Sequence, residues 1–442
     1  MPIKISGVAT LEETNVSNAY DTVLMPRHRW YYYKEGFSPR LVSKAIDGLS
    51  LKKTDLVIDP FNGSGTVTLT CALKGIPSIG LEVNPFTAFI AKAKTYNVDV
   101  AQLEIDAAKL LKHIKSDNQT VSRWIGISTF TESDNLKKWL FNREVADAYE
   151  SGFLALDRVE DVRIRSILKV ALISSLMSCA NARRDGKCFK YRAGWQDAHI
   201  GKSNFVKVLS DKLRLCIEDV KGTTIEQAAK VICADSRSYL AKGIQHGFSL
   251  CITSPPYLNT FDYTDIYRPE LFMGGFIDDN KALYRLRLKT IRSHVQALWP
   301  SPDENDFGKE YNNVMRYLLD NQDKLMNKRI PMMVQAYFED MLNILESLMA
   351  NARDGAQIWI VVATSAYAGL EVPVDRIIKR IGECVGFNLV NIAKLRDIRK
   401  RKTQYSGEID FLRESLVMLR KPKKRYKVMA CRTSILSRWL AQ

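Results

Sequence analysis

The chain lacks the signatures of several protein classes. Its eight cysteines, at positions 71, 179, 188, 216, 233, 251, 384 and 431, are scattered, and none form the Cys-x-x-Cys pair typical of zinc or redox sites. We therefore expect no metal, and buried thiols in a reducing cytosol. The N-terminus has no charged segment followed by an apolar run, and the longest apolar stretch, residues 170–177, is too short to cross a bilayer. These absences predict a soluble, cytoplasmic protein with no membrane partner.

The composition does not suggest disorder. The chain has 442 residues, of which 46% are hydrophobic, so it exceeds one ordinary domain and can bury a sizeable core. The formal net charge of +16 favours a polyanionic partner, although a basic solvated surface would carry the same charge. The charge does not separate DNA from RNA.

Residues 56–75 read as a short apolar strand, a glycine-containing turn and a helix, and a second strand follows and ends at Glu82. This pattern predicts the opening of a Rossmann-like unit, although it is not the dinucleotide motif GxGxxG. Gly63 and Gly65 let the backbone approach a ligand, and the helix starting near Thr66 offers free N–H groups. Glu82 is placed to accept ribose hydroxyls, and Asp59 to accept a cationic amino group such as that of S-adenosylmethionine.

The segment SPPY, residues 254–257, directly follows an apolar strand. Two prolines fix two φ angles, so the carbonyls around Ser254 and Pro255 point outward as acceptors, and Tyr257 supplies a stacking face. This shape suits a base that has left a double helix. A Pro-Pro turn leaving a strand is the structural alternative.

Together, DPFNGSGT (59–66) and SPPY resemble the amino-methyltransferases of DNA, whose loops read DPFxGSGT and [DNS]PP[YFW]. Serine at the first catalytic position resembles the N4-cytosine subgroup more than the adenine enzymes. The resemblance implies a class I Rossmann-like α/β fold, S-adenosylmethionine as cofactor and double-stranded DNA as substrate, with a possible cognate restriction endonuclease. Many SPPY enzymes place the catalytic loop before the cofactor loop, whereas here the cofactor loop comes first. The implied catalytic residues are Ser254, Pro255, Pro256 and Tyr257, and the implied cofactor contacts are Phe37, Asp59, Phe61, Gly63, Gly65, Thr66, Glu82 and Asp235.

Two of these cofactor positions have a structural alternative. Asp235 ends an apolar strand near the expected adenine site, but it also fits a helix cap. Phe37 precedes a helix with Ser38 as N-cap and Pro39 at the first position, and an aromatic there is also typical of the core.

Other activities remain open or are disfavoured. No cysteine follows a proline, so the nucleophile of enzymes that methylate a ring carbon of cytosine is missing, and an exocyclic amine is the better target. N4-cytosine methylation is the first hypothesis and N6-adenine methylation the second. RNA guanine methylation and an inactive nucleic-acid-binding scaffold are the remaining alternatives.

The α/β pattern is interrupted twice. Residues 103–229 read as a helical insertion whose segment 181–195 mixes basic and aromatic side chains, suited to phosphate contact or to an exposed loop. Residues 276–332 form a basic insertion, where the spacing predicts a helix over 284–299 with a basic face toward DNA. The candidate DNA contacts are Arg183, Arg184, Lys187, Lys190, Arg285, Arg287, Lys289 and Arg292.

The rest of the chain would complete one catalytic domain. Residues 1–102 hold its cofactor-binding part, 230–275 its catalytic loop, and 333–442 the remaining sheet and a basic tail. Residues 357–364 and 411–421 read as strands and 372–387 as an amphipathic helix, while 395–407 read as a basic loop.

Overall fold

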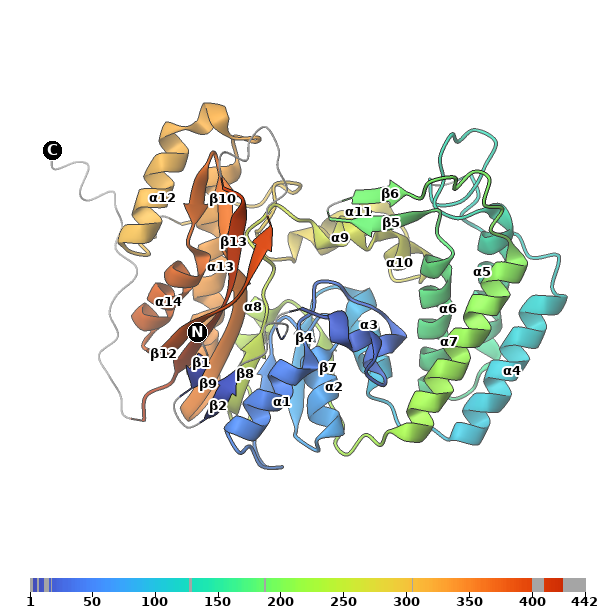
Figure 1. The fold of residues 1–442 in the computed structure, drawn as a ribbon, viewed down its shortest axis with the longest axis horizontal. Coiled ribbons are helices and arrows are strands. Elements are labelled where there is room, and N and C mark those ends of the chain that lie inside the picture. Colours follow the sequence, from blue (N-terminus) through green and yellow to red (C-terminus); the bar gives the residue numbers. More distant parts are fainter. Residues whose placement is uncertain are drawn as a thin grey trace.

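The computed structural model describes residues 3–5, 8–11, 16, 18–126, 129–186, 188–303, 305–399 and 409–423. A seven-stranded sheet in the order β12-β13-β9-β8-β3-β4-β7 lies at its centre (Figure 1). Its strands are β3 (Val57–Asp59), β4 (Ser78–Glu82), β7 (Lys230–Cys233), β8 (Phe248–Thr253), β9 (Ala352–Ala363), β12 (Asn388–Arg399) and β13 (Phe411–Arg420).

The sheet confirms the expected Rossmann-like α/β class. The pairs from β7 to β9 are parallel, and only β13 runs antiparallel to both of its neighbours. From the central β3 the chain builds outward through β4 to β7, and then returns to the other side of β3 with β8. A switch of direction at this point opens a crevice beyond the carboxyl ends of the strands, where such folds bind ligands.

Alternation along the strands gives the sheet two apolar faces. Trp359 and Val361 of β9 pack on one face, and Ile358, Ile360 and Val362 pack on the other. Successive side chains of a strand point to opposite sides, so a strand buried on both faces is apolar throughout. This accounts for the continuous apolar run from which the strand at 357–364 was predicted.

Helices cover both faces. Side chains of α1 and α2 pack on the face of Trp359, and those of α8, α12, α13 and α14 pack on the other. Ser38 caps α1 through a 3.1 Å hydrogen bond from the Arg40 N–H, with Pro39 in the first turn, as predicted. The helices are α1 (Pro39–Gly48), α2 (Thr66–Leu73), α3 (Pro85–Lys94), α8 (Ser236–Leu240), α12 (Lys309–Asp320), α13 (Ile330–Asn351) and α14 (Val374–Val385).

A separate group of helices lies beside the sheet, at the right of Figure 1. The hydrophobic core of this group contains side chains of α3 and of the helices that follow α3 before β7. The central helix α6 is buried along most of its length. Within the described residues no helix is both long and apolar enough to span a membrane. The group contains α4 (Val100–Ser116), α5 (Arg143–Ala155), α6 (Val162–Ser178), α7 (Lys202–Gly222) and the hairpin strands β5 (Ala182–Asp185) and β6 (Cys188–Tyr191).

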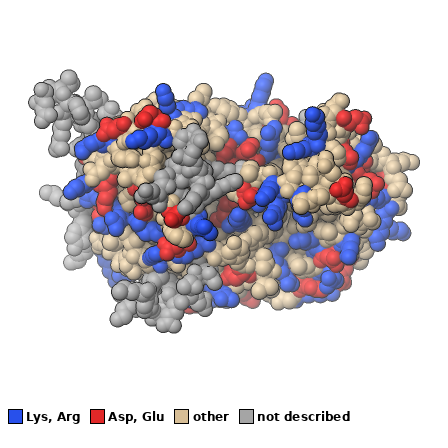
Figure 2. Space-filling model, turned by 45° about the horizontal axis from the view of Figure 1, so that its top comes forward, with Lys and Arg blue, Asp and Glu red and all other residues tan. Residues whose placement is uncertain are grey.

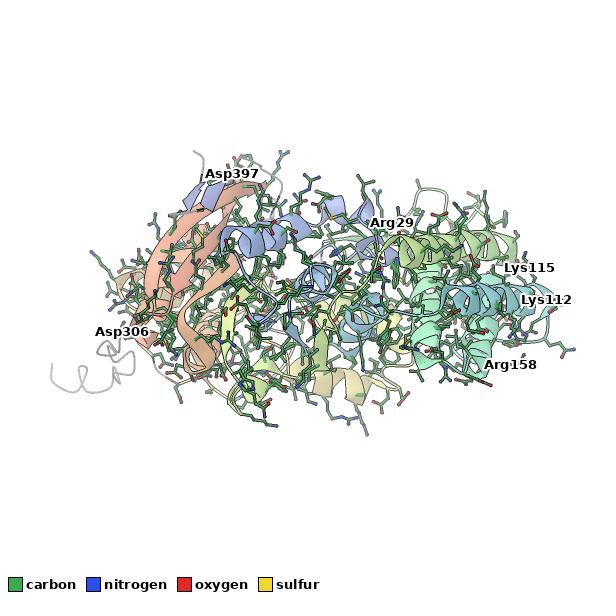
Figure 3. The ribbon with its side chains drawn as sticks, turned by 90° about the horizontal axis from the view of Figure 1, so that it is seen from below. Arg29, Lys112, Lys115, Arg158, Asp306 and Asp397 are labelled. Carbon is green, nitrogen blue, oxygen red and sulfur yellow. The ribbon has the colours of Figure 1, made fainter. Side chains whose placement is uncertain are left out.

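Smaller elements complete the described chain. Lys112, Lys115 and Arg158 mark the end of the helical group that lies farthest from the sheet (Figure 3). The remaining elements are β1 (Ile3–Ile5), β2 (Val8–Leu11), β10 (Ser365–Tyr367), β11 (Leu370–Val372), α9 (Tyr263–Ile266), α10 (Arg268–Met273), α11 (Asn280–Leu288) and the 3-10 helices η1 (Tyr20–Val23), η2 (His28–Trp30), η3 (Leu156–Arg158) and η4 (Gln322–Lys324).

Two sequence predictions about local structure were wrong. The helix expected over 284–299 ends at Leu288, because the next residues are held elsewhere: Arg292 donates its backbone N–H to Asp340 of α13 at 2.9 Å, and the Ser293 carbonyl accepts from Thr260. Residues 395–399, expected in a basic loop, belong to β12, where they pair with β13. Residues 400–407 and 424–442 lie outside the described residues.

Candidate active site

Polar side chains follow four neighbouring parallel strands. Asp59 ends β3, Glu82 ends β4, Asp235 follows β7 and Ser254 follows β8. All four line one cavity of about 1020 Å³. Residues far apart in the sequence therefore meet at the carboxyl edge of the sheet, where the strand order predicts a ligand site.

The turn after β3 needs its glycines. Gly63 and Gly65 have φ angles of 49° and 90°, a region that costs other residues roughly 1–2 kcal/mol. A Cβ on Gly65 would also lie 2.8 Å from the Cβ of Ala91 in α3, which is closer than packed carbon atoms come. The turn consequently brings the start of α2 and its free N–H groups to the cavity wall.

Asp59 is a buried carboxyl group whose hydrogen bonds only partly offset its loss of solvent. It accepts hydrogen bonds from the Thr253 hydroxyl at 2.6 Å and from the Phe61 N–H at 3.0 Å. Burial nevertheless raises the pKa of Asp59 to about 7, since these two bonds offset only part of the desolvation and the Glu82 carboxylate adds repulsion. A cationic group in the cavity would relieve this cost.

Glu82 is held in place by the backbone. Its two carboxylate oxygens accept from the N–H groups of Gly63 and Asn84, each at 2.8 Å. Burial raises the pKa of Glu82, and these bonds oppose the increase. The glycine turn and the acidic end of β4 therefore form one hydrogen-bonded unit, with a fixed carboxylate that can accept from ligand hydroxyls.

The catalytic loop is linked to the far side of the sheet. The Tyr257 hydroxyl donates to the buried Glu414 of β13 at 2.6 Å, and Glu414 pairs with Arg396 of β12 at 2.6 Å. Burial and the Glu414 charge raise the pKa of Tyr257, while the Ser254 side chain opposes this increase. Tyr257, Glu414 and Arg396 thus form a chain of polar contacts that fixes the tyrosine end of the loop.

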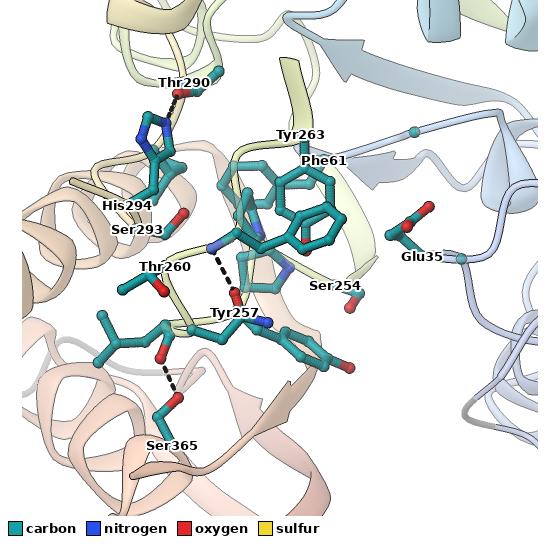
Figure 4. Close-up of a pocket in the computed structure, with 18 of the residues that line it drawn as sticks. Glu35, Phe61, Ser254, Tyr257, Thr260, Tyr263, Thr290, Ser293, His294 and Ser365 are labelled. Carbon is teal, nitrogen blue, oxygen red and sulfur yellow. Dashed lines mark hydrogen bonds between the residues drawn. The ribbon is translucent and has the colours of Figure 1, made fainter. Parts of the chain in front are cut away.

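The next residues of this loop are anchored as well. The Leu258 carbonyl accepts hydrogen bonds from the hydroxyls of Ser365 (Figure 4) and Tyr367. The Thr260 N–H donates to the Ser293 carbonyl at 3.0 Å. Thr260 adopts a φ of 60°, which is uncommon for a β-branched residue. The loop is consequently held from β10 and from the segment after α11.

Phe37, Phe61, Gly63, Thr66 and Asp235 also line this cavity, whereas the predicted cofactor position Gly65 does not. Phe37 is buried in the core with side chains of α1, whereas Phe61 is half-buried. Asp235 caps α8 by accepting from the Arg237 N–H at 3.0 Å, and it also forms an ion pair with Arg237. Asp235 therefore caps α8, as its structural alternative predicted, and it also lines the cavity.

The predicted basic contacts fall into two groups. Arg184 pairs with Glu270, Arg287 with Asp262 at 2.5 Å, and Arg292 with Asp340 at 2.8 Å, so these charges already have internal partners. The exposed members are Arg183, Lys190, Arg285 and Lys289. Lys187 lies outside the described residues.

Sequence reasoning missed several residues of the cavity. Glu35 enters it from the N-terminal segment, accepts a hydrogen bond from the Tyr267 hydroxyl and has a pKa raised by burial. Figure 4 shows Glu35 on the side of the pocket near Ser254. Glu414 had a sequence signal, because it is an acidic residue at the apolar positions of a predicted strand. For Glu35 the only sequence signal was its position near Phe37 in the sequence.

Within the described residues, no group of three or more His, Cys, Asp or Glu is arranged to hold a metal ion. Four of the described cysteines, Cys71, Cys179, Cys216 and Cys251, are buried free thiols, whereas Cys188 and Cys233 are exposed.

Sequence comparison relates the chain to known methyltransferases. A family described as DNA methylase matches residues 9–93, which contain α1, the glycine turn and β4. The chain is 26% identical over 436 residues to the Type II methyltransferase M.AvaI of Nostoc sp., covering 90% of this chain and 87% of that relative. It is 26% identical over 452 residues to the Type II methyltransferase M.BsoBI of Geobacillus stearothermophilus, covering 89% and 86%. Among solved structures, the rRNA methyltransferase aviRa of Streptomyces viridochromogenes aligns over 87% of this chain and 85% of its own, with 12% identity and a TM-score of 0.28.

Proposed function

Since the chain belongs to the amino-methyltransferases of DNA, we propose that it methylates the exocyclic N4 amine of a cytosine within a specific sequence of double-stranded DNA. Ser254, at the first position of the catalytic loop, supports cytosine over adenine as the target. The Type II relatives support a place in a restriction-modification system with a cognate endonuclease.

S-adenosylmethionine is the cofactor, and it supplies a methyl group bound to positively charged sulfur. The cavity suits it, because the buried Asp59 has no cationic partner among the described residues and Glu82 presents a fixed acceptor beside the glycine turn. We assign Asp59 to the amino group of the ligand and Glu82 to its ribose hydroxyls. The remaining contacts that we propose are Phe37, Phe61, Gly63, Gly65, Thr66 and Asp235.

The target base must leave the duplex before it can react, because its amine is inaccessible inside the stack. Unstacking costs a few kcal/mol. The ring of Tyr257 would recover roughly 1–3 kcal/mol by stacking on the extruded base. Pro255 and Pro256 keep that ring at a fixed position beside Ser254.

The electronic problem is that the lone pair of a base amine is delocalised into the ring. If the amine donates to Ser254 Oγ and to the Pro255 carbonyl, both outside the ring plane, its nitrogen becomes more tetrahedral and more nucleophilic. These oxygens also stabilise the charge that develops on nitrogen, and the surplus proton leaves to water.

The observation that carries the proposal is the 2.6 Å hydrogen bond between Asp59 and Thr253. It joins the last residue of the cofactor strand to the residue just before the catalytic serine. The cofactor end and the SPPY loop consequently share one cavity, as a direct methyl transfer requires.

The test is mass spectrometry of nucleosides from the DNA of a methylation-free host that expresses the chain, with Ser254→Ala as control. We expect N4-methylcytosine with the wild type only. N6-methyladenine instead would move the assignment to adenine while keeping the same residues. Unmodified DNA would contradict the proposal and direct the search to the RNA pool, and then to a scaffold role.

Purified variants test the mechanism. Ser254→Ala should mainly lower turnover, because the ground-state contacts of the base are largely retained. Tyr257→Ala should lower both turnover and the binding of the extruded base. Turnover equal to that of the wild type in both variants would refute the proposed role of the loop.

A further inference from the structure

The β5–β6 hairpin has two chemically different faces. Its cross-strand pairs set Arg184 opposite Phe189 and Arg183 opposite Lys190. Arg184 is turned inward: it pairs with the fully buried Glu270 and lies over the Tyr267 ring at 4.5 Å. The hairpin is thereby anchored to α10 through one face only.

The outward face carries an unusual pair. Arg183 and Lys190 are both exposed, and like charges directly opposite each other on a ladder destabilise it. Within the described residues neither side chain has a hydrogen bond or an ion pair. An anionic partner would remove the repulsion, so this face is complementary to a polyanion.

The hairpin also points at the active site. Gly186, at its turn, lines the same cavity as Ser254 and Asp59. In Figure 1 the hairpin lies at the top, between the helical group and the sheet, and Lys and Arg side chains are spread over the corresponding face in Figure 2, among acidic ones. A duplex that delivers a base to the cavity must therefore pass close to this hairpin.

We propose that the outward face of the β5–β6 hairpin enters the major groove beside the target base, with Arg183 and Lys190 on the phosphates that flank it. This inference rests on the proposed function and assigns its DNA-reading element. A two-stranded ribbon fits the major groove, which is roughly 12 Å wide. Asp185 lies on the same exposed face nearer the turn, where a carboxylate accepts from a base amine.

The base of the hairpin is rigid enough for this task. Tyr191 and Trp139 both pack on Trp195, with ring centroids 5.0 Å apart in each pair. The Arg192 N–H donates to the Asn181 carbonyl at 2.9 Å and closes the ladder. A docked ribbon would consequently lose little conformational freedom on binding.

The first test compares two double variants of the full chain that lose the same charge. Arg183→Gln/Lys190→Gln changes the hairpin, and Lys112→Gln/Lys115→Gln changes exposed lysines at the far end of α4 (Figure 3). The probe is a duplex with the sequence that the wild type methylates in the host genome, titrated at several salt concentrations. Each phosphate contact contributes about 0.9 to the slope of log K against log salt, so the hairpin variant should lose about 1.8. The control variant should keep the wild-type slope.

The second test uses the native thiol of Cys188, which is exposed opposite Asp185 on the proposed docking face. We expect bound duplex, but not S-adenosylmethionine alone, to protect Cys188 of the wild-type protein from alkylation, as measured by peptide mass spectrometry. This readout holds even if the hairpin variant folds poorly.

Equal slopes in the two double variants, or an unprotected Cys188 in a DNA-bound wild type, would overturn the hairpin assignment. A wild type that methylates no DNA would instead refute the proposed function, and that result appears before any variant is made.

Discussion

The buried carboxyl of Asp59 makes cofactor affinity depend on pH. Its pKa of about 7 refers to the protein without ligand, where no cation of the described part of the chain offsets burial. A cationic ligand prefers the ionised form, so binding lowers this pKa and releases a proton. Affinity should therefore rise as pH rises through 7, the opposite of what a protonated carboxyl donor would give.

The magnitude follows from the ionised fraction. With a pKa of about 7, roughly 9% of Asp59 is ionised at pH 6 and roughly 91% at pH 8, a tenfold gain in binding-competent protein. Asp59→Asn keeps the shape and removes the charge. Loss of a charge-assisted contact costs roughly 1.5–3 kcal/mol, so at pH 8 the variant should bind roughly 10- to 150-fold more weakly.

Isothermal calorimetry with S-adenosylmethionine at pH 6, 7 and 8 measures both effects. The ratio of the dissociation constants of Asp59→Asn and wild type cancels the titration of the ligand itself, and it should grow about tenfold across this range. Without ligand, Asp59→Asn should melt above the wild type at pH 8, by a margin that shrinks toward acid, because only the wild type then buries a charge. A ratio that does not change with pH would refute the assignment of Asp59 to the amino group.

Three further variants test the rest of the site. Tyr257→Phe keeps the stacking ring but frees Glu414, so turnover should fall while the fluorescence of a 2-aminopurine target still reports extrusion; wild-type turnover would show that the hydroxyl is dispensable. Glu414→Gln should lower turnover similarly and also lower the melting temperature, whereas an unchanged turnover would remove Glu414 from the positioning chain. Gly65→Ala should weaken cofactor binding measured by calorimetry, because it adds both a strained φ and a clash with α3, while Gly126→Ala shares only the positive φ and should bind normally.

Local signals were enough to predict most strands of the sheet and its two loops, but not β12. The glycine turn, the caps and the apolar runs are set by neighbours in sequence, and β3, β4, β8, β9 and β13 appear where they were predicted. Whether a basic residue forms an internal ion pair could not be predicted in this way, because its partner lies far away in the sequence. Glu270 lies 86 residues from Arg184, and Asp340 lies 48 residues from Arg292. Nothing in a charged segment itself tells whether its charge faces DNA or an internal carboxylate.

The same distinction explains the failed helix over 284–299. The apolar spacing favoured a helix, but the Arg292 N–H donates to Asp340 and the Ser293 carbonyl accepts from Thr260, so neither group takes part in a helical hydrogen bond. These bonds place the segment against the catalytic loop, which is why Lys289 and His294 line the cavity. The deviation from the local pattern therefore occurs where the site needs it.

The unusual order of the two loops along the chain has no consequence for the chemistry, because the sheet brings them together in either order. β3 and β8 are paired neighbours, with Val57 opposite Leu250 and Ile58 opposite Cys251. Their carboxyl ends must then emerge side by side, and the Asp59–Thr253 bond joins them there. What the order does change is which segments are free to become insertions. With the cofactor loop first, the long connection from β4 to β7 can carry the helical group, and its hairpin reaches back to the cavity through Gly186.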